Sequence, residues 1–179
     1  MDLTRDQEKA IQNALELDDL STDDKVVLKE MLKLKKVKNR EFTLYVDGAS
    51  DLHSKTAGIG GVIYVGDEEI TCFSEPIHDK TNNESEYMAL IKGIKVAHEL
   101  KITKLIIHAD SELVVKQVLG EYKVKNNRMK ELHSQALDEL QNIDDWSIIH
   151  VRREYNTRAD ELSKIGMEKA RIEKTEMPG

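Results

Sequence analysis

The order of hydrophobic and polar positions after residue 41 predicts a mixed α/β domain. Three runs rich in β-branched and aromatic residues predict an antiparallel meander of strands, at Phe42–Val46, Ile59–Val65 and Glu69–Phe73. Apolar residues recur at helical spacing along Asn83–Leu100, which predicts a long helix. The segments that follow alternate between strands and helices, at Lys104–His108, Ser111–Leu119, Arg128–Ile143, Trp146–Val151 and a last helix from about Thr157.

Residues 1–40 have a different pattern, which predicts a pair of helices. Thr4 and Gln7 have the spacing of a capping box at the start of the first helix, and the polar stretch Asp18–Asp24 separates it from the second. The second helix carries an apolar stripe and a basic stripe, formed by Val27, Leu28, Met31 and Leu34 and by Lys25, Lys29, Lys33 and Lys36. We therefore expect an N-terminal helical hairpin at 1–40, a main domain at 41–170 and a polar C-terminal tail at 171–179.

Composition narrows the class of protein. A hydrophobic content of 39% is enough for a core, while 34% charged residues indicate a soluble surface. No apolar run approaches the ~20 residues that cross a bilayer, and the N-terminus is too acidic for a signal peptide. Cys72 is the only cysteine, which fits a reducing cytoplasm. The formal charge of -7 argues against holding nucleic acid by bulk electrostatics alone, although not against nucleic acid as a substrate.

Four acidic residues stand where one predicted element gives way to the next. Asp47 ends the first strand, and Asp110 follows the strand that ends at His108. Glu86 and Asp160 lie near the starts of two helices. If the first and fourth strands are neighbours in the sheet, all four carboxylates converge. Such a cluster would repel itself without a positive charge, and the natural choice is a hard divalent cation with oxygen ligands.

Each of these residues also has a purely structural interpretation. Asp47 with Gly48 reads as a turn, and Glu86 could close a capping box begun by Asn83. Asp110 could cap the helix after it, and Asp160 could favour the positive end of its helix. Taken singly, these interpretations are at least as good as the functional one, so the case depends on the four residues together.

The segments around these acids resemble the four motif blocks of the ribonuclease H type I family, in the family's order and over residues 42–170. They are Tyr45-Val46-Asp47-Gly48-Ala49-Ser50, Thr81-Asn82-Asn83-Glu84-Ser85-Glu86-Tyr87, Asp110-Ser111 and Asn156-Thr157-Arg158-Ala159-Asp160. The resemblance implies a ribonuclease H-like fold, a five-stranded mixed sheet with helices on both faces. It also implies a ribonuclease H catalytic domain at 41–170 that cuts the RNA strand of RNA–DNA hybrids.

The resemblance further implies the site and its cofactor. Asp47, Glu86, Asp110 and Asp160 correspond to the catalytic, metal-binding set, which would hold two Mg²⁺ ions, with Mn²⁺ as a substitute. In such two-metal sites one ion activates the attacking water and the other stabilises the leaving 3′ oxygen, which gives 5′-phosphate and 3′-hydroxyl ends. Hybrid contacts correspond to Gly48, Ala49, Ser50, Asn82, Asn83 and, more weakly, Ser111, while Thr81 corresponds to a contact with a DNA phosphate.

Three features depart from the family pattern. Asp51–Thr56 replaces a Gly/Pro-rich segment, and Gly120–Asn126 is short where some members have a basic, tryptophan-containing protrusion. The chain therefore resembles the short-loop subfamily without that protrusion. Some members have a histidine between the last strand and the last helix, but Glu154-Tyr155-Asn156 of this chain contains none. His150, inside the predicted strand, is interpreted as structural. Arg153 matches the arginine of a His-Val-x-Arg segment that lies near the site, which makes it either a catalytic residue or a surface arginine.

Other functions and the role of the hairpin stay open. The same fold could serve as a non-catalytic nucleic-acid-binding module, or as an exonuclease or strand transferase, although the block ending at Glu86 argues against the last two. The sequence leaves cleavage of double-stranded RNA open. In the hairpin, nine acidic residues lie mostly early and nine basic ones mostly late. Either its apolar stripes pack on the main domain or a partner chain, or its lysine face holds the backbone of the hybrid.

Overall fold

The computed structural model describes residues 3–17, 19–38 and 40–176, with the side chains of 33–38 left aside. The chain forms two compact units, residues 1–40 and 41–179, each of which is considered by itself. Within the described residues, no helix is both long and apolar enough to span a membrane.

The first unit consists of two helices, α1 (Arg5–Leu15) and α2 (Thr22–Lys38). The predicted capping box starts α1, since the Thr4 hydroxyl accepts from the Gln7 amide and the Gln7 side chain accepts from the Thr4 amide. No residue of α1 is buried, and Leu17, Val26 and Val27 are more than half exposed. Two members of the predicted basic stripe, Lys33 and Lys36, lie outside the described side chains. The hairpin therefore leaves apolar surface open within the part that the structure describes.

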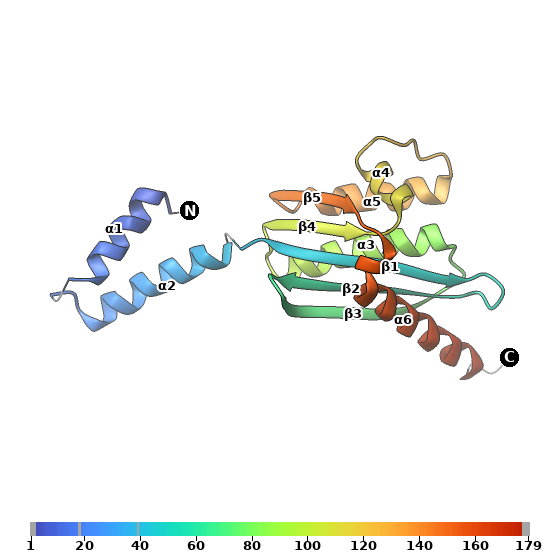
Figure 1. Ribbon diagram of the computed structural model, residues 1–179, viewed down its shortest axis with the longest axis horizontal. Helices are drawn as coiled ribbons and strands as arrows, with labels where there is room; N and C mark the ends of the chain where they lie inside the picture. Colours follow the sequence, from blue (N-terminus) through green and yellow to red (C-terminus); the bar gives the residue numbers. More distant parts are fainter. Residues whose placement is uncertain (1–2, 18, 39, 177–179) are drawn as a thin grey trace. The chain divides into compact units, whose positions relative to one another are not determined.

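The second unit is built on a five-stranded mixed sheet (Figure 1). Its spatial order is β3-β2-β1-β4-β5; β1 pairs antiparallel with β2 and parallel with β4. At the edges of the sheet, β3 pairs antiparallel with β2, and β5 pairs parallel with β4. The predicted meander and the adjacency of the first and fourth strands are both confirmed. The strands are β1 (Phe42–Asp51), β2 (Thr56–Val65), β3 (Glu68–His78), β4 (Lys104–Ala109) and β5 (Asp145–His150).

Helices cover both faces of this sheet, as predicted. On one face α3 (Asn82–Glu99) packs on β1 and β2, and α4 (Glu112–Val118) and α5 (Asn127–Leu140) adjoin it. The main apolar core lies here, around the fully buried side chains of Leu44, Leu90 and Ile107. The other face carries α6 (Thr157–Glu176), which packs on β1, β2 and β3. Between β5 and α6 lies a single 3₁₀ turn, Arg153–Tyr155.

The helix α6 lies unusually close to the sheet because glycine leaves room for it. A Cβ atom added to Gly60 of β2 would lie 2.3 Å from the Ser163 amide nitrogen and 2.7 Å from the Ala159 carbonyl oxygen. Both are backbone atoms, which cannot rotate out of the way. The absence of a side chain at Gly60 therefore sets the distance between α6 and the centre of the sheet.

The predicted tail at 171–179 is wrong in part, because α6 continues to Glu176. Its last turns are polar, which is why they resemble a tail in sequence. In the structure these polar side chains bond to the end of β1 and to the turn after it: Arg171 Nη2 to Asp51 Oδ2 at 3.3 Å, and Lys174 Nζ to the Ser54 carbonyl at 2.6 Å. Ala170 is fully buried among them. Long-range hydrogen bonds thus stabilise a segment that its composition alone places in solvent.

Candidate metal centre

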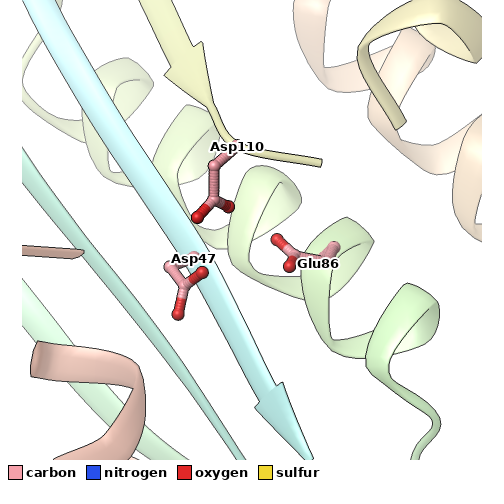
Figure 2. Close-up of side chains that lie close together, drawn as sticks. All are labelled: Asp47, Glu86 and Asp110. Atoms are coloured by element: carbon pink, nitrogen blue, oxygen red, sulfur yellow. The ribbon is translucent and has the colours of Figure 1, made fainter. Parts of the chain in front are cut away.

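Three of the four predicted carboxylates meet at one point on the sheet (Figure 2). Asp47 comes from β1, Glu86 from α3, and Asp110 follows β4 directly. One oxygen from each lies within 4.8 Å of the others. The parallel pairing of β1 with β4 brings Asp47 and Asp110 to neighbouring positions, and α3 crosses behind them.

The expectation that Asp47 ends its strand is wrong. The strand β1 continues to Asp51, and Gly48 pairs with Ile59 of β2. The Asp-Gly pair indicated a turn, but the glycine is there for another reason. A Cβ atom at Gly48 would lie 2.3 Å from the Ser85 carbonyl carbon, so only glycine allows α3 to approach the strand. This approach lets the Gly48 amide donate to Glu86 Oε2 at 3.2 Å.

The structural interpretation of Glu86 as a capping residue is also wrong. The helix α3 begins one residue earlier than predicted, with Thr81 as its N-cap and Glu84 closing the capping box. The Thr81 hydroxyl donates to Glu84 Oε2 at 2.7 Å, and the Glu84 amide donates back to Thr81 at 3.3 Å. Glu86 is left free to point into the cluster, where only 5% of it is exposed.

Burial and mutual repulsion raise the proton affinity of this cluster. Burial, with the negative charges of Asp47 and Asp110 added to it, raises the pKa of Glu86 to about 9. Burial also raises the pKa of Asp47 to about 6, although a hydrogen bond from Ser163 opposes this shift. Glu86 therefore carries a proton at neutral pH unless a cation lies beside it.

These raised pKa values make stability depend on pH in metal-free buffer. The ordinary pKa of Glu86 is 4.5, so between that value and about 9 the folded state binds a proton that the unfolded state has released. Stability is therefore lost as pH rises through this window. We expect the free energy of unfolding, measured by urea titration in a chelator, to fall from about pH 7 to about pH 9. In Glu86→Gln the slope should be smaller, and an unchanged slope would contradict this assignment.

Asp160 lies beside the cluster and is bonded by two positively charged side chains, Arg153 and Lys164. Arg153 Nε donates to Asp160 Oδ1 at 3.1 Å, and Lys164, one helical turn further along α6, bonds the other oxygen. Burial alone would raise the pKa of Asp160, but the hydrogen bonds from Lys164 and Arg153 outweigh it and hold that pKa below its ordinary value. The charge of Asp160 also raises the pKa of Asp47, so the two carboxylates share one electrostatic environment.

The predicted substrate contacts differ in burial. Gly48 is buried, Ala49 and Ser50 are half-buried, and Asn82 and Asn83 are exposed at the start of α3. Two of the predicted side chains have structural duties as well. Thr81 caps α3, and the Ser111 hydroxyl accepts from the Val114 amide as the N-cap of α4. This leaves Asn82 and Asn83 as the contacts with freely available side chains.

Sequence reasoning missed two residues of the site, Ser163 and Lys164. The Ser163 hydroxyl donates to Asp47 Oδ2 across 116 positions of sequence, and it is fully buried. Lys164 pairs with Asp160 at the i, i+4 spacing of a helical ion pair. That spacing was a usable signal for Lys164. No local pattern marks Ser163.

The donor set fits a hard divalent cation. Asp47, Glu86 and Asp110 offer only oxygen ligands, which suit Mg²⁺ or Mn²⁺ and not the softer metals that prefer sulfur or imidazole. A bound cation would also stabilise the charged forms of Asp47 and Glu86, whose pKa values are raised without it. Asp160 would be the fourth carboxylate next to it.

Comparison with known proteins connects this arrangement to one group of enzymes. A family model described as reverse transcriptase-like matches residues 45–166. Ribonuclease HI of Halobacterium salinarum is 35% identical over 127 residues, which make up 70% of this chain and 64% of that protein. A bifunctional protein of Mycobacterium tuberculosis is 33% identical over 126 residues, but the match spans only 35% of its length.

Solved structures agree with these matches. The crystal structure of RNase H1 from Halobacterium salinarum superposes with a TM-score of 0.70 at 33% identity, and covers 73% of this chain and 99% of that one. LC11-RNase H1, solved in complex with an RNA/DNA hybrid, superposes with a TM-score of 0.68 at 32% identity and covers 73% and 99% of the two chains. The residues that the family model matches, 45–166, lie within the second unit and include Asp47, Glu86, Asp110 and Asp160.

Proposed function

This chain belongs to the ribonuclease H type I family, and we propose that it is an endonuclease that hydrolyses the RNA strand of RNA–DNA hybrids. One observation carries the proposal: Asp47, Glu86 and Asp110, from three separate elements of the family's fold, lie within 4.8 Å of one another. The likeness to LC11-RNase H1, which was solved with an RNA/DNA hybrid, supports the choice of substrate.

The reaction needs a divalent metal, which Asp47, Glu86, Asp110 and Asp160 would hold. Two Mg²⁺ ions, or Mn²⁺ in their place, would activate a water and stabilise the leaving 3′ oxygen, giving 5′-phosphate and 3′-hydroxyl ends. The chain's own part is to fix the carboxylates. The Gly48 amide holds Glu86, and α6 holds both Asp47, through Ser163, and Asp160, through Lys164.

Residues around the carboxylates would select RNA by its sugar. The 2′-hydroxyl is the group that distinguishes an RNA strand at a given position. Gly48 is buried and its amide donates to Glu86, while Ala49 and Ser50, which follow it, are half-buried and carry small side chains; this stretch of backbone would face the ribose. The amide side chains of Asn82 and Asn83 both donate and accept hydrogen bonds, as a hydroxyl partner requires. Ser111 is a weaker candidate for the same role, and Thr81 would face a phosphate of the DNA strand.

Cleavage of three labelled duplexes side by side tests this function. We expect the hybrid to be cut within its RNA strand in Mg²⁺ or Mn²⁺, DNA duplex to stay intact, and a chelator to stop the reaction. RNA duplex in the same series shows whether a second substrate is accepted. Binding of hybrid without cleavage would replace the proposal with a non-catalytic binding module.

Arg153 is proposed to act on the scissile phosphate or on product release. Its side chain is 70% exposed yet bonded to Asp160, so it lies at the open edge of the metal centre. Arg153→Ala should lower the steady-state rate while metal and hybrid still bind, and lysine should rescue only partly, because it lacks the planar two-pronged donor. The matched control is Arg152→Ala, whose side chain is 79% exposed and pairs with Glu154 at 3.8 Å. Equal rates for the two alanine variants would make Arg153 a surface residue.

The N-terminal hairpin is proposed to hold the phosphate backbone of the hybrid. Lys29 is exposed and Lys25 is half-buried on α2, which leaves their charges available to phosphates. Each phosphate contact makes the plot of log affinity against log salt concentration steeper by about one unit. Deleting residues 1–38 should therefore raise the KM for hybrid and flatten its salt dependence, with little change in the maximal rate. Replacing Lys25 and Lys29 with glutamine in the full chain should shift both quantities in the same direction. If only the deletion has an effect, the apolar stripes are the active surface.

A further inference from the structure

Ser163 lies at the junction between α6 and the metal centre. Its side chain is fully buried, and its hydroxyl oxygen contacts two acceptors, Asp47 Oδ2 and the Asp160 carbonyl oxygen, the latter at 2.9 Å. A serine inside a helix ordinarily bonds back to a carbonyl of the preceding turn. Here a carboxylate from a strand competes for the same hydrogen.

The carboxylate is the stronger of the two acceptors. A hydroxyl has one hydrogen to donate, and a hydrogen bond to an ionised oxygen is about twice as strong as one to a neutral carbonyl. Ser163 therefore donates to Asp47 Oδ2 in preference to the helix carbonyl. Figure 2 shows the two oxygens of Asp47 pointing apart, one toward Asp110 and Glu86 and the other away from them.

A second hydrogen bond fixes α6 to the same strand. Asn156, directly before α6, is buried, and its side-chain amide donates to the Val46 carbonyl at 2.9 Å. The residue that accepts this bond immediately precedes Asp47. The backbone before Asp47 and the side chain of Asp47 are thus both tied to the helix that carries Asp160.

We propose that Ser163 is a positioning residue of the metal centre: its hydroxyl holds one oxygen of Asp47 and leaves the other directed at Glu86 and Asp110. Ser163 lies three residues after Asp160 on α6, and its hydroxyl oxygen is 2.9 Å from the Asp160 carbonyl oxygen, so the helix that carries Asp160 also fixes the side chain of Asp47. This inference rests on the proposed function, since the orientation of Asp47 matters only if a metal binds there.

Metal binding by the full chain tests the inference, because a positioning role weakens the site before it affects chemistry. Loss of such a supporting contact typically lowers metal affinity by about 10–100-fold. Ser163→Ala should raise the Kd for Mn²⁺, measured by calorimetry without substrate, by about tenfold or more. The Mg²⁺ concentration for half-maximal hybrid cleavage should rise by the same factor, and the rate at saturating Mg²⁺ should largely recover.

The control is Ser74→Ala. Ser74 of β3 donates to the Leu162 carbonyl of α6 at 2.7 Å, so its loss removes a hydroxyl bond between sheet and helix one residue from Ser163 without touching a carboxylate. Its Kd for Mn²⁺ should stay within about twofold of the wild-type value. If Ser163→Ala does not fold, Ser163→Cys fills the same space with a weaker donor and should show the same loss of affinity.

Three results separate the failures. A wild-type chain that binds no Mn²⁺, or an Asp47→Asn variant that binds as well as wild type, overturns the proposed metal centre itself. A wild-type affinity that depends on Asp47 but survives in Ser163→Ala and Ser163→Cys overturns only the role of Ser163. An equal loss in Ser74→Ala overturns it too, because the effect would then belong to the docking of α6 in general.

Discussion

Replacing Asp110 with asparagine is expected to abolish hybrid cleavage and leave the fold intact. The substitution keeps the size and shape of the side chain but removes one of the four carboxylates that would hold the metal. Metal ions contribute several kcal/mol to such reactions, which corresponds to a rate loss of about a thousandfold or more. Cleavage of labelled hybrid at saturating Mg²⁺ measures this directly.

The same variant should be at least as stable as wild type when no metal is present. The charge of Asp110 raises the pKa of both Glu86 and Asp47, so its removal relieves repulsion inside a buried cluster. A raised Tm in chelator together with lost activity would show that the carboxylate serves the reaction and not the fold. Asp138→Asn, on an exposed part of α5, controls for the substitution itself. Activity within about tenfold of wild type in Asp110→Asn would remove this residue from the site.

The sheet and most helices were predictable because their patterns are local. The apolar segment Lys104–His108 and the helical spacing along Asn83–Leu100 each determine an element from neighbouring residues alone. Asp47 and Asp110 were predicted to meet because they follow or end strands that a mixed sheet places side by side. That adjacency is confirmed by the parallel register of β1 with β4.

What sequence missed depends on contacts between distant residues. Asp47-Gly48 indicates a turn by its local sequence, but Gly48 lies inside a strand. Glycine is needed there because α3 passes so close that a Cβ atom would clash with it. The last turns of α6 are polar enough to look like a tail, yet Arg171 and Lys174 bond to the end of β1 and to the turn after it, 120 positions away. Ser163 is an ordinary helical serine until Asp47 is placed beside it. In each case the structural role of the residue is determined by a partner that is distant in sequence, which the local pattern does not show.

Substituting Gly60 with alanine is expected to destabilise the second unit strongly. The new Cβ would lie 2.3 Å from the Ser163 amide nitrogen and 2.7 Å from the Leu162 carbonyl carbon, so the backbone of α6 must move. Overpacking of this kind costs about 1–3 kcal/mol, and rigid backbone partners place Gly60→Ala at the upper end, a fall in Tm of roughly 6–12 °C. Thermal unfolding in chelator measures the effect.

The displacement should also reach the metal centre, because α6 holds Asp160 directly and Asp47 through Ser163. Gly60→Ala should therefore weaken Mn²⁺ binding even at temperatures where the protein is fully folded. Gly66→Asn is the control: Gly66 has φ of 59°, nothing lies within 4 Å of its would-be Cβ, and asparagine tolerates this conformation. Its Tm and metal affinity should stay near wild type. If Gly60→Ala unfolds at a lower temperature but binds Mn²⁺ as tightly as wild type, the helix can move without carrying the carboxylates with it, and the connection from glycine through α6 to the metal centre is wrong.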